Sequence, residues 1–449
     1  MAGADTEALV QGIGRELHAA LPRPSRHPVK ALDARAMELT SRDADLRAAL
    51  FRLVDVTPAC RSLADLARHL VSYLGEVDSA PASLERALRA ADNAAGRQAL
   101  GAAAAAAVRH MAHRFIVGES PRAAERTLRG LWRDGAACSV DLLGEATVTR
   151  EEADRYAARC REALDELAAA TARWPERPAL EADSLGPLPR VNLSVKVSAL
   201  TPLMHPEAPE AGRDDAAARM RPLLRRAKEL GAHLHIDTES LDTLETTTEL
   251  VFELLDEPEF RDGPSAGVVL QAYLRESPEQ LERLRDFSRA SERGAPLTVR
   301  LVKGAYWDHE VVEARRHGWR VPVFEEKSDS DRNFEQLTTR LIEARRGGAR
   351  LRVAIASHNL RSVAHAIARN REGGGEDSDL ELQVLRGLGD ELMEALAASG
   401  MRVRAYCPVG DLVAGMAYLV RRLLENTSND SFLADQGRGV PVGDLLAAP

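Results

Sequence analysis

Polar side chains stand at the ends of seven short β-type runs in the C-terminal two thirds of the chain. These residues are Lys196, Asp237, Gln271, Arg300 with Lys303, Ser357 with His358 and Asn359, Gln383, and Tyr406. Several are cationic or can become so, and Asp237 is the one clear carboxylate among them. A basic rim on a protein of net charge −9 suits an anionic ligand, such as a carboxylate substrate or the phosphates of a cofactor.

Alternation within the runs places their polar residues on a common face. In residues 191–197, Asn192, Ser194 and Lys196 share one face, because successive strand side chains point in opposite directions. After the fifth run, the turn at 303–305 (Lys-Gly-Ala) lets the backbone approach a phosphate while the lysine neutralises it. This tripeptide is a weak motif by itself, so the prediction of an anion site depends on the whole set of strand ends.

A second group of cations lies on the last helical segment, residues 417–430. Arg421 and Arg422 are adjacent, and paired guanidinium groups suit bidentate capture of a carboxylate. Tyr418 precedes both, and Glu425 follows Arg421 by four positions, a spacing that suits an ion pair on a helix. The competing interpretation is a solvated helix face, because all but five of the 60 basic residues are arginines. Apolar neighbours leave little room for a wholly polar face and favour ligand binding.

A metal site is a further hypothesis. His233 and His235 form an HxH pair whose imidazoles would point to the same side of a strand, and His358 could be a third ligand. In barrel metallohydrolases, however, the HxH pair lies on the first strand and an aspartate ends the last. Here the pair lies on the third run and the eighth ends in Tyr406. We therefore expect histidines of the core, with a metal-dependent hydrolase as the alternative.

The elements that position these residues alternate between strands and helices from about residue 137 onward. This alternation indicates a parallel sheet, and eight repeats fit a TIM-like (β/α)8 barrel. A doubly wound open sheet is the alternative, but no GxGxxG turn follows any run. A helix is expected after each run, the last at residues 412–424. The expected strands are Ser139–Leu143, Val191–Val197, His233–Asp237, Val268–Ala272, Leu297–Val302, Leu351–Ala356, Leu380–Val384 and Val403–Tyr406.

Helical spacing dominates the beginning of the chain, which contains no convincing strand. We expect an all-helical accessory region at residues 1–119, the barrel at residues 120–435 and a C-terminal tail at residues 436–449. Three segments rich in loop-forming residues are expected to be surface insertions, namely residues 175–189, 206–215 and 371–379.

The composition is that of a soluble globular protein. Of the 449 residues, 45% are hydrophobic and 29% are charged, which excludes a collagen, a coiled-coil rod and wholesale disorder. The acidic balance argues against a nucleic-acid partner, and the longest apolar run, Ala102–Val108, is far too short for a membrane span. No signal segment is expected, and the four cysteines lack metal-binding spacing. They are typical of reduced thiols in a cytoplasmic protein.

Ten blocks between Met111 and Phe432 together resemble the proline dehydrogenase family, in particular the flavin-dependent barrel of bacterial proline utilization A proteins. Each block is modest alone, but ten in the family's order are highly specific. The resemblance is weaker before residue 100, and no basic ribbon-helix-helix segment is present, so DNA binding is not implied. The blocks are MAHRFIVGES, CSVDLLGEAT, VNLSVKVSAL, HIDTES, VVLQAYL, VRLVKGAYWD, SHN, LELQVLRGLG, YCPVG and YLVRRLLENTSNDSF.

The resemblance implies oxidation of L-proline to Δ1-pyrroline-5-carboxylate, with hydride transfer to flavin N5. The implied catalytic residues are Asp237 and Arg300, with Arg300 near the N5 edge. The lysine and the two arginines of the substrate site would hold the proline carboxylate, and its tyrosines would line the rest of the pocket. The implied substrate-binding residues are Lys196, Tyr406, Tyr418, Arg421 and Arg422.

The resemblance also implies FAD as the cofactor. Residues 324–327 read Phe-Glu-Glu-Lys where the family tends to have Tyr-Thr-Arg-Lys, and Ser330-Asp331 replaces Thr-Asp. The resemblance therefore does not define the contacts to the adenine side of the cofactor. The implied cofactor-binding residues are Thr238, Gln271, Arg300, Lys303, Gly304, Ala305, Trp307, Ser357, His358, Asn359, Gln383 and Glu425.

The partners implied by the resemblance are L-proline and a quinone that reoxidises the flavin at a membrane surface. Bifunctional members carry an aldehyde dehydrogenase module after the barrel. Since this chain ends at Pro449, a separate aldehyde dehydrogenase is expected to receive the product. A catalytically inactive barrel with an assembly role is disfavoured, because the implied pocket residues are all present.

Overall fold

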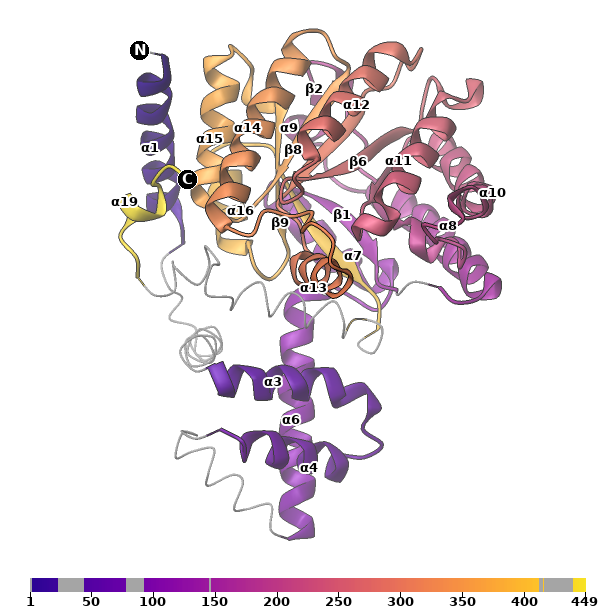
Figure 1. The fold of residues 1–449 in the computed structure, drawn as a ribbon, viewed down its shortest axis with the longest axis vertical. Helices are drawn as coiled ribbons and strands as arrows, with labels where there is room; N and C mark the ends of the chain where they lie inside the picture. Colours follow the sequence, from indigo (N-terminus) through magenta and orange to yellow (C-terminus); the bar gives the residue numbers. More distant parts are fainter. Residues whose placement is uncertain (1, 23–43, 78–92, 145–146, 412–414, 416–438) are drawn as a thin grey trace.

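The computed structural model describes residues 2–22, 44–77, 93–144, 147–411, 415 and 439–449. Within these residues, eight parallel strands close into a barrel in which β1 pairs with both β10 and β4 (Figure 1). The predicted barrel is confirmed, and every expected strand overlaps an observed one. The strands are β1 (Ala136–Leu142), β4 (Asn192–Lys196), β5 (His233–Asp237), β6 (Ser265–Gln271), β7 (Leu297–Val302), β8 (Leu351–Ala356), β9 (Leu380–Leu385) and β10 (Val403–Val409).

Helices surround the barrel and connect successive strands (Figure 1). The segment 206–215, expected as a loop, is helical from Pro209 onward, and the helix expected at residues 412–424 lies outside the described residues. The helices are α7 (Pro121–Arg133), α8 (Arg150–Thr171), α10 (Pro209–Glu229), α11 (Leu241–Asp256), α12 (Ser277–Ala290), α13 (Trp307–His317), α14 (Lys327–Arg346), α15 (Leu360–Glu372) and α16 (Asp390–Ala398).

Short elements complete the barrel and its ends. Four are single turns of 3-10 helix, and two short strands form an antiparallel hairpin. These elements are η1 (Thr57–Ala59), α9 (Pro178–Glu181), β2 (Ala182–Asp183), β3 (Gly186–Pro187), η2 (Val197–Ala199), η3 (Pro258–Phe260), η4 (Asp377–Asp379) and α19 (Val442–Leu445).

The two faces of each strand have different partners. Outward-facing residues such as Leu193 and Val195 are fully buried beneath the helices. On α14, Phe334, Leu337 and Leu341 recur at helical spacing and are also fully buried. Burying a side chain of this size contributes roughly 1.5–3 kcal/mol, so this helix layer stabilises the barrel strongly.

The barrel interior is polar, whereas branched aliphatic residues fill the interior of most such barrels. Arg300 of β7 donates hydrogen bonds to Ser139 of β1 and Ser194 of β4, at 3.3 and 3.4 Å. Neither strand is a neighbour of β7, so these contacts cross the interior. Ser139 in turn donates to Asn192 Oδ1 at 2.7 Å. The predicted common face of the polar strand residues is therefore the inside of the barrel.

Helices α3 (Ala44–Val56), α4 (Leu63–Leu74) and α6 (Ala94–Phe115) form a layer that projects from the barrel (Figure 1). Leu53, Leu66 and Leu70 belong to its buried apolar cluster. The helices α4 and α6 approach so closely that a Cβ on Gly101 would lie 1.9 Å from the carbonyl oxygen of Leu63. The predicted N-terminal helical region is confirmed in the described residues.

The first helix, α1 (Ala2–Ala20), lies apart from that layer and packs along α15 (Figure 1). Its buried stripe consists of Val10, Ile13 and Leu17. Arg361 of α15 pairs with Glu7 at 2.6 Å and also donates to the backbone oxygen of Leu446 at 2.9 Å. Segments from both ends of the described chain thus meet on one barrel helix.

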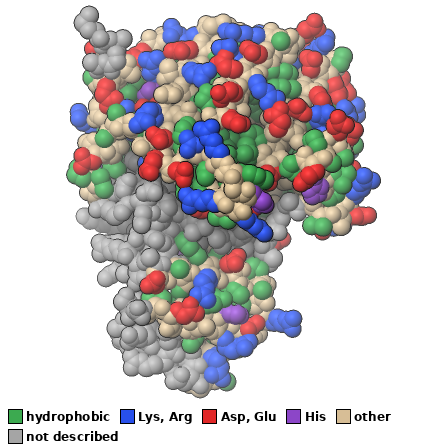
Figure 2. All heavy atoms as spheres, in the orientation of Figure 1, with side chains coloured by type: hydrophobic (Ala, Val, Ile, Leu, Met, Phe, Trp, Pro, Cys, Tyr) green, Lys and Arg blue, Asp and Glu red, His purple; other side chains and the backbone are tan. Residues whose placement is uncertain are grey.

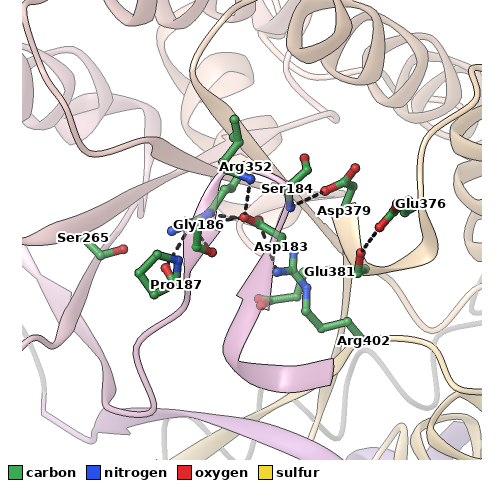
Figure 3. A network of polar contacts seen from close by, with 12 residues as sticks. Asp183, Ser184, Gly186, Pro187, Ser265, Arg352, Glu376, Asp379, Glu381 and Arg402 are labelled. Atoms are coloured by element: carbon green, nitrogen blue, oxygen red, sulfur yellow. Dashed lines mark hydrogen bonds and ion pairs between the residues drawn. The ribbon is translucent and has the colours of Figure 1, made fainter. Parts of the chain in front are cut away.

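The β2–β3 hairpin lies at the end of the barrel where the strands begin (Figure 3). The hairpin is partly exposed, as expected of a surface insertion at residues 175–189, but one of its side chains points inward. The side chain of Asp183 is fully buried and pairs with Arg352 (Nε–Oδ2 3.0 Å) and Arg402 (Nη1–Oδ2 3.4 Å). These partners lie 169 and 219 residues further along the chain, so the local composition of the segment could not reveal the burial.

Acidic and basic side chains intermingle over the described part of the barrel surface seen in Figure 2. Many belong to ion pairs between neighbouring helices, such as Arg213 with Glu249 and Arg225 with Glu259. Among the described residues, no helix is long and apolar enough to span a membrane.

Candidate active site

Four predicted residues meet at the end of the barrel where the strands finish. Lys196, Asp237 and Gln271 are the last residues of β4, β5 and β6. Tyr406 lies in β10, which is not a neighbour of β5, yet its hydroxyl donates to Asp237 Oδ2 at 2.7 Å. These side chains therefore converge across the barrel mouth, where barrel enzymes carry their chemistry.

Asp237 is the centre of this group. Its Oδ1 accepts a hydrogen bond from Arg300 Nη1 at 2.8 Å, and Lys196 Nζ lies 3.7 Å from its Oδ2. The carboxylate thus faces two cations and a phenol, all of them buried or nearly so. Charge-assisted hydrogen bonds of this kind are about twice as strong as neutral ones.

Asp141 of β1 is a second carboxylate of the site, and the expectation that Asp237 is the one at the strand ends is wrong. Its side chain is fully buried, and its Oδ1 accepts a hydrogen bond from Lys196 Nζ. Its Oδ2 has no hydrogen-bond partner among the described residues. The signal for this residue was present in the sequence, because Ser139 and Asp141 alternate on β1 as Ser194 and Lys196 do on β4.

The surrounding charges fix the protonation states of two residues of the site, Lys196 and Tyr406. Burial works to lower the pKa of Lys196, but Asp141 and Asp237 outweigh it and hold the pKa above its ordinary value. Burial, together with the same two carboxylates, raises the pKa of Tyr406 well above its ordinary value. Near neutral pH the site therefore presents an ammonium group and a neutral phenol that donates a proton in a hydrogen bond.

Arg300 is held from three sides. Besides Asp237, its guanidinium bonds to the two serines of β1 and β4 in the barrel interior, and it lies 5.2 Å from the ring centre of Tyr406. Only 4% of the residue is exposed. Arg300 therefore points into the barrel, and its surroundings leave the guanidinium little freedom to move.

Gln271 and Thr238 lie beside this group at the ends of β6 and β5. Gln271 Nε2 donates to the backbone oxygen of Glu239 at 3.0 Å, while its buried Oε1 has no hydrogen-bond partner in the described chain. Thr238 Oγ1 donates to the backbone oxygen of Val269 at 3.3 Å. A buried acceptor without a donor is costly, so this position suits a bound group that carries an N–H or O–H.

The turn after β7 is shaped by a glycine and an ion pair. Gly304 has φ +132°, and a Cβ there would lie 2.4 Å from the ring of Tyr273, so a larger residue would not fit. Lys303 pairs with Asp331, which also pairs with Lys327 at 2.6 Å. Asp331 and Lys327, which match the family pattern in a segment that otherwise departs from it, thus form the ionic surroundings of the predicted phosphate-binding lysine.

Two further predicted cofactor contacts follow the same turn. Ala305 is the residue after Gly304, and Trp307 is the first residue of α13. The Trp307 indole N–H donates to the backbone oxygen of Phe324 at 2.8 Å, while 38% of the residue stays exposed. The ring therefore offers a partly open apolar surface beside the turn.

The three predicted residues after β8 form a tight connection into α15. Asn359 caps this helix by accepting a hydrogen bond from the backbone of Ser362 at 3.2 Å, and Ser357 Oγ accepts one from the backbone of Asn359 at 3.1 Å. His358 Nε2 accepts a hydrogen bond from the backbone N–H of Leu385 at 2.9 Å. These contacts hold the connection against the end of β9.

Gln383 is the predicted cofactor residue whose side chain turns away from this rim. Its Nε2 donates to Glu381 Oε1 at 2.6 Å, deeper in the barrel. Its backbone oxygen accepts a hydrogen bond from Ser357 N at 3.3 Å. The structure therefore connects Gln383 to the rim through its backbone.

The three histidines of the metal hypothesis lie at opposite ends of the barrel. His233 begins β5 and His235 lies in its middle, whereas His358 follows the end of β8. His233 Nε2 lies 3.2 Å from His235 Nδ1, and its Nδ1 lies 2.8 Å from Ser265 Oγ. Among the described residues, no group of three or more His, Cys, Asp or Glu side chains is placed to hold a metal ion. The arrangement does not support the three-histidine site.

Four predicted site residues lie outside the described residues, so the structure does not test their placement. They are Tyr418, Arg421, Arg422 and Glu425.

Two family models match the chain. The model for proline dehydrogenase matches residues 124–435, and that for the proline utilization A N-terminal domain matches residues 7–115. The second match extends the similarity into the region before residue 100, where the sequence blocks were weaker.

Curated relatives agree with these matches. The bifunctional protein PutA of Escherichia coli is 30% identical over 381 residues, which cover 82% of this chain and 27% of the relative. The proline dehydrogenase of Deinococcus radiodurans is 30% identical over 332 residues, covering 72% of this chain and 89% of the relative. The chain thus spans about a quarter of the length of the bifunctional relatives.

A solved structure is similar over almost the whole chain. It is proline utilization A from Bdellovibrio bacteriovorus inactivated by N-propargylglycine, with a TM-score of 0.89 and 34% sequence identity. The similarity covers 99% of this chain and 44% of that one.

Proposed function

The chain belongs to the proline dehydrogenase family, and from this premise we propose that it oxidises L-proline to Δ1-pyrroline-5-carboxylate with FAD as the cofactor. The observation that carries the proposal is the buried group around Asp237. This carboxylate accepts hydrogen bonds from Arg300 and Tyr406 and faces Lys196 at the mouth of the barrel.

The substrate is held by charge in this proposal. Lys196, whose ammonium stays charged, binds the proline carboxylate together with Arg421 and Arg422, which are assigned from the sequence alone. Tyr418, also assigned from the sequence, packs against the pyrrolidine ring. A clamp of three cations fixes one end of a small zwitterion and thereby orients the C–H bond that is broken.

The residues at the rim fit a flavin cofactor. The buried Oε1 of Gln271 lacks a donor in the described chain, and the turn at Lys303, Gly304 and Ala305 pairs a close backbone approach with a cation. When bound, FAD supplies the acceptor for the hydride that leaves the carbon beside the proline nitrogen. The other proposed cofactor contacts are Thr238, Arg300, Trp307, Ser357, His358, Asn359, Gln383 and Glu425.

In this proposal, the side chains of the site hold one another in place and neutralise charge on the cofactor. Asp237 already accepts two hydrogen bonds, so it holds Arg300 and Tyr406 in place more effectively than it could take up a proton. Arg300, fixed from three sides, presents a positive charge that favours the anionic reduced cofactor. The Tyr406 phenol keeps its proton and donates a hydrogen bond.

The proposal also includes an acceptor for the electrons of the reduced cofactor and a recipient for the product. We assign a quinone as the acceptor, reached at the surface of a membrane by a cytoplasmic enzyme. An aldehyde dehydrogenase activity receives the product. The basis is similarity to relatives described as bifunctional, of which this chain spans about a quarter.

The first experiment is the visible spectrum of the purified protein under anaerobic conditions, before and after addition of L-proline. A flavin spectrum that bleaches with L-proline supports cofactor, substrate and direction together. Prior treatment with N-propargylglycine, which inactivates the Bdellovibrio relative, is expected to prevent the bleaching. A flavin spectrum that L-proline leaves unchanged contradicts the substrate, and a protein that neither contains nor takes up FAD contradicts the whole proposal.

The predicted carboxylate clamp has a separate kinetic test. Arg421→Met and Arg422→Met each remove a charge-assisted contact of roughly 1.5–3 kcal/mol and are expected to raise the KM for proline sharply while flavin stays bound. An unchanged KM removes the residue from the clamp.

A further inference from the structure

The end of the barrel opposite the candidate active site encloses a small polar cavity. Its volume is about 20 Å³, and its polar lining includes Asn192, His235, Arg352, Glu381, Gln383, Arg402 and Arg404. The segment that leads from the β2–β3 hairpin into β4 also lines it, through Leu188 and Pro189. A cavity of this size has room for a single water or a small ion.

The charges around this cavity do not balance. Among the described residues, four guanidinium groups and three carboxylates form one network, part of which Figure 3 shows. All seven groups are buried or nearly so, and the network carries one excess positive charge. An uncompensated charge in such a place costs several kcal/mol. The network, called here the hairpin network, consists of Asp183, Arg345, Arg352, Asp379, Glu381, Arg402 and Arg404.

The excess charge is localised at Arg402. Arg352 donates to Asp183 and to two backbone oxygens of the hairpin, and Arg404 binds both oxygens of Glu381 at 2.8 and 3.0 Å. Arg402 reaches Asp183 only at 3.4 Å, and its buried Nε has no partner among the described residues. Burial lowers the pKa of Arg402, and the attraction of Glu381 and Asp183 does not offset this. A missing counter-charge explains all three observations.

The histidine pair adds a second unsatisfied group to the cavity without adding charge. Burial lowers the pKa of His233 to about 3 and that of His235 well below its ordinary value, so both rings are neutral at physiological pH. His235 Nε2 is buried and has no partner in the described chain. The two hydrogen bonds fit either of two tautomer sets. In the set in which Ser265 donates to His233 and His233 donates to His235, the free His235 Nε2 carries a proton, and this is the set that an anion would select.

We propose that this cavity binds one small monovalent inorganic anion of the chloride class, held by Arg402 and His235. The anion neutralises the excess charge of the hairpin network and accepts hydrogen bonds from the two unsatisfied groups. An ion the size of chloride fits a volume of about 20 Å³. Its two proposed ligands, Arg402 and His235, are distinct from the proposed proline and flavin residues, although Gln383 also lines the cavity.

The test compares anions at constant ionic strength on the enzyme as purified. The protein is dialysed into sodium gluconate, and gluconate is then replaced stepwise by chloride or bromide while thermal unfolding is followed. We expect a saturable rise of the midpoint of about 1–3 °C. Arg402→Met is expected to abolish the rise, whereas Arg371→Gln, which removes an exposed arginine paired with Asp377, is expected to retain it. Equal midpoints in all three salts overturn the proposal.

Crystals of the wild-type protein grown in bromide provide a test that needs no variant. An anomalous peak inside the cavity, within hydrogen-bond distance of Arg402, supports the site. A water in the cavity without anomalous signal overturns it. Neither readout depends on flavin or proline, so the anion site and the proposed enzymatic activity succeed or fail independently.

Discussion

The two ends of the barrel bury the same kinds of charged side chains in different arrangements. Where the strands finish, two cations, Lys196 and Arg300, face two carboxylates, Asp141 and Asp237, so the described charges there are balanced. Where the strands begin, the hairpin network has one cation too many among the described residues, and the β2–β3 hairpin covers it.

Charge balance distinguishes the two ends more than exposure does. A fully buried carboxylate stands at each end, Asp141 at the first and Asp183 at the second, and the neighbouring Asp237 and Asp379 are 11% and 12% exposed. A buried group with excess charge suits a ligand that stays bound. We call the first end, where the substrate is proposed to bind, the open end, and the second, which the β2–β3 hairpin covers, the closed end. We therefore expect changes at the first end to affect activity and changes at the second to affect stability.

The largest expected effect is on stability at the closed end. Asp183→Asn removes the carboxylate that three guanidinium groups share and leaves them buried together. Breaking a buried pair costs about 3–5 kcal/mol, so chemical denaturation should show a loss of that order. Turnover of proline per folded molecule should change less than twofold.

The matched control for this variant is Asp377→Asn, whose exposed partner is Arg371. It should change the free energy of unfolding by less than about 0.5 kcal/mol. Equal losses in the two variants would contradict the role assigned to the closed network.

The complementary change at the open end is Asp237→Asn. It removes the charge that orients Arg300, Tyr406 and Lys196, and two charge-assisted bonds of roughly 1.5–3 kcal/mol each are weakened. Steady-state kinetics should show kcat/KM for proline reduced by about 100- to 1000-fold. A loss below threefold, with the flavin still bound, would show that the carboxylate does not organise the site.

The pH dependence of stability should separate the two ends. His233 has a folded-state pKa of about 3 against 6.5 for an ordinary histidine, because burial disfavours its charged form. Its contribution to stability is therefore present above about pH 6.5 and is lost as the pH falls toward 3, at roughly 1 kcal/mol per unit. The glutamine of His233→Gln cannot titrate, so the free energy of unfolding of this variant should depend less steeply on pH between about 3 and 6.5. Identical slopes in the variant and the wild-type protein would refute this assignment.

At the open end, the pKa shift of Lys196 gives a pH dependence of stability with the opposite sign. Because its carboxylate neighbours raise its folded-state pKa, its contribution is complete below the unfolded pKa of about 10.4 and is lost as the pH rises through the folded value. Above pH 10, the free energy of unfolding should therefore fall less steeply with rising pH in Lys196→Met than in the wild-type protein.

The smallest effect is expected for Tyr406→Phe. The change removes one hydrogen bond, 2.7 Å long, to Asp237 and leaves the ring against Arg300. A loss of about 1 kcal/mol corresponds to about fivefold in kcat/KM, with little effect on the unfolding midpoint. A loss as large as that of Asp237→Asn would instead assign the phenol a direct part in the reaction.

Sequence periodicity predicted part of the open end. Alternation placed Lys196 and Asp237 at strand ends, and the same rule applied to β1 identifies Asp141. Strand ends are local features, and barrel topology then brings them together. The placement of Tyr418, Arg421, Arg422 and Glu425 stays a prediction, because these residues lie outside the described chain.

The closed end could not be predicted in the same way. Nothing near Asp183 distinguishes it from an ordinary turn residue, since the groups that bury it belong to β8 and to the start of β10. Side-chain direction also limited the prediction for Gln383, which was assigned to the rim but donates to Glu381 in the interior. Burial of charge depends on distant partners, and local patterns carry no information about them.

The docking of α1 on α15 has a consequence for the order of synthesis. The apolar stripe of Val10, Ile13 and Leu17 leaves the ribosome long before α15 exists. Glu7 and its partner Arg361 are 354 residues apart, and at 5–20 residues per second this interval lasts roughly 20–70 s. The helix α1 must therefore wait for its partner, and a nascent chain must keep its apolar stripe from other apolar surfaces until then.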